Sequence, residues 1–230
     1  MGPPLDPLPQ AGGQVRDLDL ALHYIPRPQR QLVAHLFALD AALGNVVRTT
    51  REPMVGRIRL AWWRERLQEI DQEIVPAEPV LEAIARVVDA TALTGTLIAD
   101  LVERWEPLID DFPWEGETIG AVAGRGAFLF GFAGMVLGTG QPEIAALAGS
   151  LWSLVDVARN CSDADSRDVL LEVATGQLEE FRGTAEASIR PLTMLGLLAR
   201  RDLERWPDIE PEATPSRAWL MIGHKLTGNL

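Results

Sequence analysis

The sequence predicts an all-α protein built as one helical bundle, and three observations support that class. Apolar residues recur every three or four positions through most of the chain, which is the spacing of helices that pack along their length. No stretch alternates polar and apolar residues over the length of a strand. Prolines divide the chain into helix-length segments, because a periodic run follows each of Pro26 with Pro28, Pro53, Pro79, Pro142, Pro191 and Pro215.

The chain has 230 residues, which is enough to bury one sizeable core. Residues 1–15 are rich in Pro and Gly and lack an apolar core region, so we expect a flexible N-terminus and no signal peptide. Residues 16–230 contain no evident linker or internal repeat. We therefore predict a single helical domain over residues 16–230, made of about eight to ten helices joined by short turns.

Composition narrows the possible partners. The formal net charge is −12, which argues against nucleic acid because phosphate binding needs a positive face. Cys161 is the only cysteine, so no internal disulfide can form, and this fits a reducing compartment. We accordingly expect a cytoplasmic protein in which Cys161 is a buried, inert thiol.

Two apolar helices are predicted on either side of the Glu52–Pro53 pair, within residues 28–74. Proline at a first helical position gives up no hydrogen bond, so Pro53 should begin the second helix. Consecutive helical residues point about 100° apart, so one of Trp62 and Trp63 should pack inward while the other faces a groove. The two apolar faces comprise Leu32, Leu36, Leu39, Leu43 and Val47, then Leu60, Trp63, Leu67, Ile70 and Ile74.

Residues 126–142 carry no charge and could be mistaken for a membrane span. The run is too short to cross a bilayer, so we expect a buried central helix, no transmembrane span and at most a peripheral membrane contact. Gly120 and Gly124, and likewise Gly134 and Gly138, stand one helical turn apart. This spacing allows two helices to approach closely.

Three strings of this sequence resemble the squalene/phytoene synthases. They are the Ile-Pro entry at residues 25–30, LFAL at residues 36–39 and EPMVGRIRLAWW at residues 52–63. The last string is particularly similar to the branch of the family that includes a mitochondrial complex I assembly factor. The resemblance implies a helical bundle of the isoprenoid-synthase type with a central apolar cavity. Residues expected to line that cavity are Phe37, Phe128, Phe132, Met135 and Trp152.

The resemblance also locates the first of two aspartate-rich motifs. In the family these motifs face each other and hold Mg²⁺, an ion that prefers oxygen ligands. The first motif corresponds to Gly44, Asn45 and Arg48, so no aspartate remains there. Arg48 would repel Mg²⁺ but can contact a phosphate directly.

The second motif corresponds to residues 153–164. Its expected aspartates fall on Asn160 and Ala164, whereas Arg159 is retained and Asp156 replaces an asparagine. Asp163 lies one residue out of register, so Asp156 and Asp163 are only weak candidates for metal ligands. We therefore predict that no metal or other cofactor is bound.

Two interpretations of these polar residues remain open. In the first, Asp156 and Arg159 form a structural pair that Arg48 joins from the facing helix. In the second, the region is a remodelled site for an anionic head group. The candidate contacts for such a head group are Arg30, Arg48, Arg59, Asp156, Arg159 and Asn160.

Three functions follow from the resemblance. The protein can be a diverged family member without metal-dependent prenyl transfer, acting through lipid or protein binding, for example in the assembly of a respiratory complex. Alternatively it is an active prenyltransferase that condenses two allylic prenyl diphosphates, with Mg²⁺ held by Asp156, Asp163 and Asp165. The third possibility is a helical interaction module whose pocket is vestigial. Mg²⁺-dependent diphosphate binding separates the second function from the other two.

Overall fold

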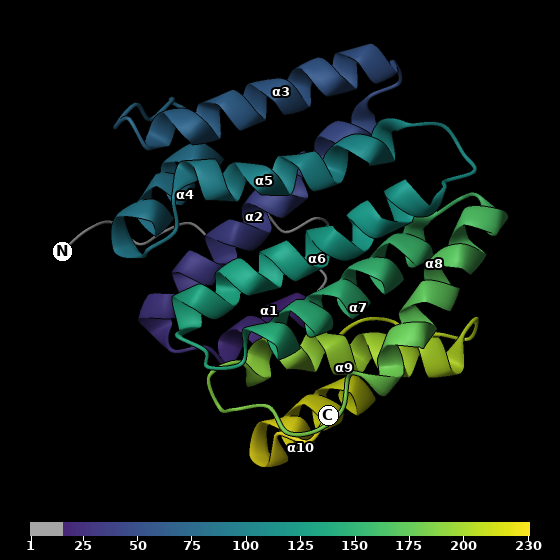
Figure 1. The fold of residues 1–230 in the computed structure, drawn as a ribbon. Coiled ribbons are helices and arrows are strands. Elements are labelled where there is room, and N and C mark those ends of the chain that lie inside the picture. Colours follow the sequence, from purple (N-terminus) through teal and green to yellow (C-terminus); the bar gives the residue numbers. More distant parts are fainter. Residues whose placement is uncertain (1–15) are drawn as a thin grey trace.

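The computed structural model describes residues 16–230, and helices joined by loops account for this part of the chain (Figure 1). Within it there is no strand, only an isolated bridge between Thr184 and Asn229, so the all-α prediction is confirmed. The expected flexibility of residues 1–15 lies outside the described residues. The elements are α1 (Asp17–His23), α2 (Arg27–Thr49), α3 (Pro53–Ile70), α4 (Pro79–Ala90), α5 (Gly95–Trp105), η1 (Glu106–Ile109), α6 (Gly116–Leu137), α7 (Pro142–Asn160), α8 (Ala164–Gly176), η2 (Gln177–Glu179), α9 (Arg190–Arg205) and α10 (Pro215–Thr227).

Prolines begin the helices as the sequence predicts. Pro53, Pro79, Pro142 and Pro215 are the first residues of α3, α4, α7 and α10. Thr214 is the N-cap of α10, as expected, but its hydroxyl does not cap the helix. The helix prediction from proline positions is therefore correct, whereas the capping bond is not formed.

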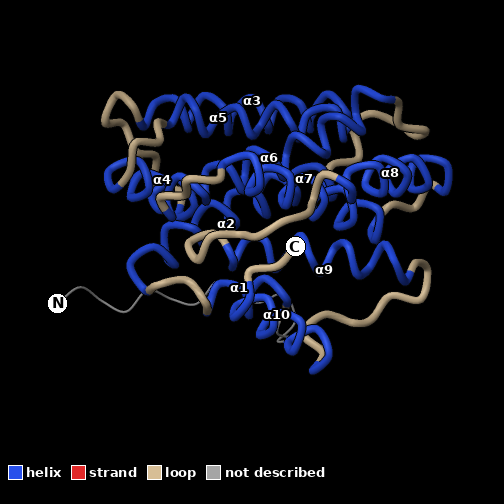
Figure 2. The backbone as a smooth tube through the Cα atoms, turned by 60° about the horizontal axis from the view of Figure 1, so that its bottom comes forward, coloured by secondary structure: helices blue, strands red, loops and turns tan. Residues whose placement is uncertain are grey.

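The bundle is layered, with α6 and α7 side by side through its middle (Figure 1). On one side α5 packs against α6 and carries α3 as the outermost helix. On the other side α9 packs against α7 and carries α10. Figure 2 shows α3 and α10 at opposite edges of the molecule. The central pocket lies in the middle of this stack, between α2, α6 and α7.

Among the helices of residues 16–230, α2 and α6 are long and apolar enough by length and composition to cross a membrane. In each, a large share of the most apolar window is buried in the bundle, 44% for α2 and 61% for α6. Core helices of globular proteins pass the same test. The packing of α6 against α5 and α7 agrees with the predicted buried central helix.

Helices α6 and α7 cross in direct backbone contact. A Cβ placed on Gly126 would lie 1.9 Å from the carbonyl oxygen of Gly149, so the two backbones touch there. The sequence predicted this role for the pairs at 120/124 and 134/138, and the prediction is correct only for one glycine of each pair. A Cβ on Gly124 would lie 3.3 Å from the side chain of Arg104 on α5, and one on Gly134 would lie 3.5 Å from Ala145 on α7. A Cβ on Gly120 meets nothing within 4 Å, and Gly138 ends α6 in the left-handed conformation with φ of 67°.

Helix α3 presents two different faces. Leu60, Trp63 and Leu67 are buried against the bundle, whereas Trp62 is 41% exposed, so the prediction that one of the two tryptophans packs inward is confirmed. The helix ends at Ile70, and Ile74 is 52% exposed. Placing Ile74 on the apolar face is therefore wrong, because Glu73 turns the chain with a positive φ of 61°.

Candidate functional site

A pocket of about 370 Å³ opens between α2, α6, α7 and the junction of α5 with η1. It occupies the predicted central position. Its wall is only partly apolar, because charged side chains from α2, α6 and α7 reach it. The residues that line it are Arg16, Leu18, Phe37, Asp40, Ala41, Val47, Arg48, Trp105, Leu108, Phe112, Trp114, Arg125, Trp152, Asp156, Val157, Asn160 and Cys161.

The inner wall of the pocket is organised by Arg125 of α6. Its Nε and Nη2 donate to the two carboxylate oxygens of Asp40 on α2, at 2.9 and 2.7 Å. Its Nη1 and Nη2 also donate to Oδ2 of Asp156 on α7, both at 3.2 Å. The indole N–H of Trp105 donates to the same Asp40 at 2.9 Å. One guanidinium therefore joins the two helices that the family resemblance assigns to the aspartate-rich motifs.

Arg125 is fully charged in this setting. It is 3% exposed, and its guanidinium carbon lies 4.3 Å from the ring centroid of Trp105 and 5.0 Å from that of Trp152. Burial alone would lower the pKa of Arg125, but the charges and hydrogen bonds of Asp40 and Asp156 outweigh it and raise the pKa above its ordinary value. The aromatic faces add cation–π attraction.

The two carboxylates lie one helical turn before the motif positions. Asp40 precedes Gly44 by four residues, and Asp156 precedes Asn160 by four. Gly44 has no room for an aspartate, because a Cβ there would lie 2.7 Å from the Trp105 ring and 3.0 Å from Nη1 of Arg48. Close packing of Trp105 against α2 is thus a physical reason why the motif carboxylate is missing.

The rim of the pocket carries further polar groups. Arg48 and Asn160, two of the predicted head-group contacts, line it, and Arg16 of the α1 entry lines it as well. The side-chain amide of Asn160 donates to the carbonyl of Asp156 at 2.8 Å. Within residues 16–230, Arg48 forms no ion pair. Three arginines and two aspartates line the pocket, so it is locally positive in a chain of net charge −12.

Arg159 belongs to a different cluster. Its Nη1 lies 3.4 Å from Asp202 of α9 and 3.8 Å from Glu212. The first of the two interpretations, in which Arg159 pairs with Asp156, is therefore wrong, because Asp156 faces Arg125 instead. The cluster encloses a small void of about 30 Å³ beside the main pocket.

Two predicted head-group contacts lie away from the pocket. Arg30 donates to the carbonyls of His23 and Ile25, at 2.7 and 2.9 Å, and so ties α2 to the end of α1. Arg59 donates to the hydroxyl of Thr50 at 3.1 Å, at the turn between α2 and α3. Each arginine bonds to the connection beside its own helix, and neither lines the pocket.

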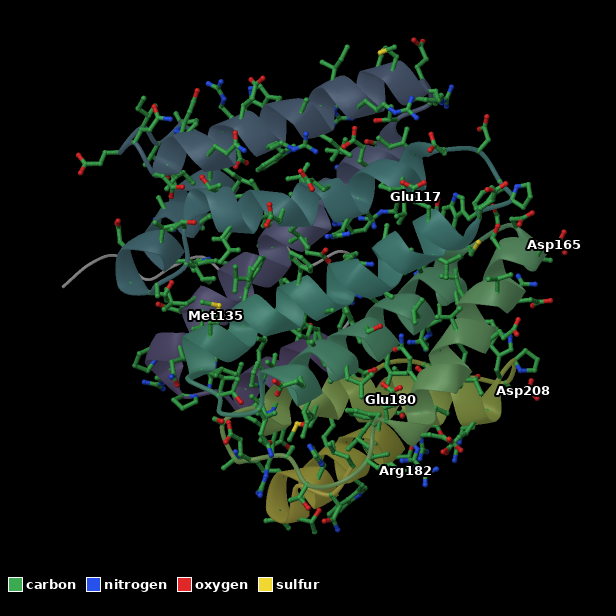
Figure 3. The ribbon with its side chains drawn as sticks, in the orientation of Figure 1. Glu117, Met135, Asp165, Glu180, Arg182 and Asp208 are labelled. Atoms are coloured by element: carbon green, nitrogen blue, oxygen red, sulfur yellow. The ribbon has the colours of Figure 1, made fainter. Side chains whose placement is uncertain are left out.

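Of the predicted cavity-lining residues, two line the pocket and three lie away from it. Phe37 and Trp152 line the pocket, and their rings pack edge to face with centroids 5.8 Å apart. Phe128 and Phe132 contact each other instead, 5.9 Å apart, and Met135 is 49% exposed on the surface (Figure 3). The prediction for these three is wrong, because α6 turns only part of its circumference toward the pocket.

The residues present do not fit a Mg²⁺ cluster. Both oxygens of Asp40 and one of Asp156 accept hydrogen bonds from Arg125. Asp163 caps α8 by accepting from the backbone N–H of Ser166 at 2.8 Å. Asp165 is exposed at the start of α8 (Figure 3). Residues 16–230 contain no group of three His, Cys, Asp or Glu side chains suited to a metal.

Cys161 lies at the end of α7, where it lines the pocket and is buried. Burial raises the pKa of its thiol above the ordinary value. The predicted burial is confirmed.

Sequence reasoning missed the residues at the centre of the site. Asp40 is a lone carboxylate on the apolar face formed by Leu36, Leu39 and Leu43. Arg125 is the only charged residue of α6 beyond its first turn. An isolated charge on an otherwise buried helix face needs a partner, and that signal could have identified both residues.

The fold is that of the all-α isoprenoid synthases. A crystal structure of a dehydrosqualene synthase in complex with ligand superimposes with a TM-score of 0.66, covering 91% of this chain and 90% of that chain at 15% identity. Residues 13–112 match the family model described as squalene/phytoene synthase. Residues 13–112, less than half of the chain, are thus similar to this family, and the match to the solved synthase concerns the fold. No curated protein sequence matches it.

Proposed function

We propose that this protein binds an anionic amphiphile in the central pocket without a divalent cation, and that it does not catalyse metal-dependent prenyl transfer. The observation that carries this proposal is Arg125, which pairs with Asp40 and Asp156 between the two motif helices. A permanent guanidinium at that place neutralises the carboxylates that would otherwise attract Mg²⁺. The side chain of Arg125 therefore supplies the positive charge that an exchangeable Mg²⁺ ion would otherwise supply.

The rest of the pocket suits a ligand with an apolar body and a negative head. The rings of Phe37, Trp105 and Trp152 form aromatic walls, and Arg48 at the rim has no carboxylate partner within residues 16–230. Guanidinium groups bind phosphates and carboxylates through paired hydrogen bonds. A pocket of about 370 Å³ also lies in the size range of small-molecule sites. The structurally similar dehydrosqualene synthase was itself solved with a ligand.

The test is a titration of the whole chain with farnesyl diphosphate, followed by tryptophan fluorescence because Trp105, Trp114 and Trp152 line the pocket. We expect the same affinity in EDTA and in Mg²⁺, with no release of inorganic diphosphate. Mg²⁺-dependent binding with diphosphate release would overturn the proposal in favour of the prenyltransferase alternative. Failure to bind farnesyl diphosphate, a prenyl monophosphate or a fatty acid under either condition would also overturn it.

A charge-reversal pair locates the binding site. Arg48→Glu should weaken binding by roughly tenfold or more, because it places a like charge beside the anionic head. Arg182→Glu makes the same change on the surface between α8 and α9, away from the pocket (Figure 3), and should leave the affinity unchanged. Equal losses of affinity in both variants would show that binding depends on the net charge of the protein and not on Arg48.

Assistance to the assembly of a respiratory complex is a second candidate. It is favoured by the similarity of residues 52–63 to the branch that includes a mitochondrial complex I assembly factor. Most of this string lies on α3, outside the pocket, so the function would depend on a protein partner. Loss of the gene should then lower the amount of assembled complex I on native gels, and normal assembly would contradict this candidate.

A further inference from the structure

The three arginines that line the pocket differ in how much charge they have left for a ligand. Arg125 faces two carboxylates, so its single positive charge is already outweighed. Arg16 pairs with Glu212, whose Oε2 lies 3.1 Å from its Nε. Arg48 is the third, and within residues 16–230 it has no carboxylate at ion-pair distance. One guanidinium at the wall is therefore free to bind an anion.

The free guanidinium lies beside the aromatic part of the wall. A Cβ placed on Gly44 would lie 3.0 Å from Nη1 of Arg48 and 2.7 Å from the ring of Trp105. The side chain of Arg48 therefore folds back along α2, in the direction that helical side chains favour, and its guanidinium lies close to the indole that lines the pocket. A ligand whose tail packs on the aromatic rings has its head within reach of Arg48.

Other groups at this wall oppose a second negative charge. Asp156 accepts from Arg125 through Oδ2, and its Oδ1 accepts no hydrogen bond from the described part of the chain. The last turns of α2, α5 and α7 reach the pocket through Arg48, Trp105 and Asn160. Each helix C-terminus carries a partial negative charge of about one half, so these three ends repel a highly charged anion.

The N-terminus of α6 does not offset this repulsion. None of residues 116–124 lines the pocket, and Glu117 occupies the first turn of the helix. The positive end of the α6 dipole therefore acts on its own glutamate, because the effect of a helix end falls off within one turn.

Neutral donors at the wall are also engaged. The indole N–H of Trp105 donates to Asp40 at 2.9 Å, and that of Trp114 donates to the carbonyl of Asp110 at 3.1 Å. A phosphate ester carries about −1.5 to −2 charges at pH 7 and offers three strong acceptor oxygens, and a diphosphate ester carries more of both. The wall does not offer the cations and donors that such a head group requires.

We propose that the ligand of this pocket is a long-chain carboxylate whose two oxygens are held by Arg48. The inference rests on the proposed function and narrows its anionic amphiphile to one with a single negative charge. A carboxylate is planar and accepts two parallel hydrogen bonds from one guanidinium. Its charge is matched by the one arginine that has no partner, and Asp156 repels it less than it repels a phosphate ester.

The test is a series of four compounds that share one apolar tail and differ in head-group charge. Farnesol, farnesoate, farnesyl monophosphate and farnesyl diphosphate are titrated into the full chain at neutral pH in EDTA, followed by tryptophan fluorescence. We expect farnesoate to bind most tightly, roughly tenfold more tightly than either farnesol or farnesyl diphosphate.

The outcomes separate this inference from the proposed function. Binding of the diphosphate as tight as that of farnesoate, or tighter, would overturn the inference and leave the proposed function standing. Equal binding of farnesol and farnesoate would also overturn the inference, because the head group would then not be recognised. If no member of the series binds, the proposed function fails and the inference fails with it.

A neutral substitution tests the role of Arg48. Arg48→Gln should lower the affinity for farnesoate about tenfold, to that for farnesol, and leave the affinity for farnesol unchanged. Arg182→Gln removes a charge from the surface away from the pocket (Figure 3) and should change neither affinity. A misfolded variant would lose both ligands, so an equal loss for farnesol and farnesoate would contradict the assignment.

A second guanidinium should change the preference. Asn160 is exposed and lines the pocket from α7, so Asn160→Arg adds a cation at the wall. This variant should bind farnesyl monophosphate roughly tenfold more tightly than the wild type does. If its preference for farnesoate stays as strong as that of the wild type, the charge of the wall does not select the head group and the inference is wrong.

Discussion

At the scale of single residues, Arg125 shows how a buried charge can be structural and functional together. Its five N–H groups are shared mainly between Asp40 and Asp156, and two indole rings flank it. Removing one member of such a buried network leaves the others without compensation. The arginine therefore holds α2, α6 and α7 together while it shapes the pocket wall.

We expect Arg125→Met to lower the free energy of unfolding by roughly 3–5 kcal/mol, because Asp40 would remain buried without its cation. Arg57→Met removes an exposed ion pair with Asp110 and should cost at most about 1 kcal/mol. Urea unfolding measures both values. The double variant Asp40→Leu with Arg125→Met should recover much of the lost stability. If the losses of the two single variants simply added in the double variant, this result would argue against the network.

Glu210 provides a prediction about pH. The hydroxyl of Ser216 and the guanidinium of Arg201 hydrogen-bond to its carboxylate and lower its pKa from 4.5 to about 2. A carboxylate whose pKa is lower in the folded state stabilises the fold above the unfolded-state pKa, and this contribution is lost as the pH falls. Glu210→Gln should therefore be less stable than the wild type at pH 7. Urea unfolding should show the difference shrinking from pH 4.5 toward about 2, and a difference that grows on acidification would contradict the assignment.

At the scale of elements, the crossing of α6 and α7 depends on two glycines. Carbonyl oxygens occupy the space where a side chain would begin, 1.9 Å from a Cβ on Gly126 and 2.1 Å from one on Gly149. The contact brings Arg125 on α6 close to Asp156 on α7. Helix spacing and pocket geometry are consequently linked.

Gly126→Ala should therefore destabilise the fold by about 3 kcal/mol or more, because only a shift of one backbone can make room for the methyl group. Gly131→Ala lies on the same helix where a Cβ meets nothing within 4 Å. It should be neutral or stabilising by up to about 1 kcal/mol, since alanine favours helix. Thermal unfolding of the two variants compares them directly, and similar melting temperatures would rule out the close crossing.

At the scale of the whole molecule, the N-terminal helix is held by the last helix through buried charges. Arg217 of α10 pairs with Asp17 of α1 at 2.6 Å and also with Asp202 of α9. Asp17 further accepts from the backbone N–H of Ala213 at 2.9 Å. Arg16, beside α1, lines the pocket. The ion pairs that Arg217 forms with α1 and α9 therefore also position part of the pocket rim.

Arg217→Met should lower the free energy of unfolding by roughly 3–5 kcal/mol, because it leaves the buried Asp17 without a cation and Asp202 with Arg159 alone. Hydrogen exchange should show faster exchange of the α1 amides, since α1 loses its anchor. Arg200→Met, which removes an exposed pair with Glu204 on α9, should change the stability by at most about 1 kcal/mol. Unchanged protection of α1 in the Arg217 variant would show that apolar contacts suffice to hold it.

Much of the fold could be predicted from local pattern, but the site could not. Proline positions located the starts of α3, α4, α7 and α10 because proline acts on its own neighbours. The rim residues Arg48 and Asn160 were found through the family resemblance. The ion pair at the centre was missed because Arg125 and Asp40 lie 85 positions apart, and no periodicity reports a pairing at that separation.

The sequence by itself determined the all-α class and the starts of several helices, because helical periodicity and proline chemistry act within a few residues. The expectation of a central cavity came from the family resemblance. Only the tertiary structure decided how the charges are paired. It placed Asp156 against Arg125 instead of Arg159, and it left Met135 at the surface. The physical reason is that a buried charge is stabilised by whichever partner the packing brings within hydrogen-bond distance, and packing depends on the crossing of helices remote in the chain.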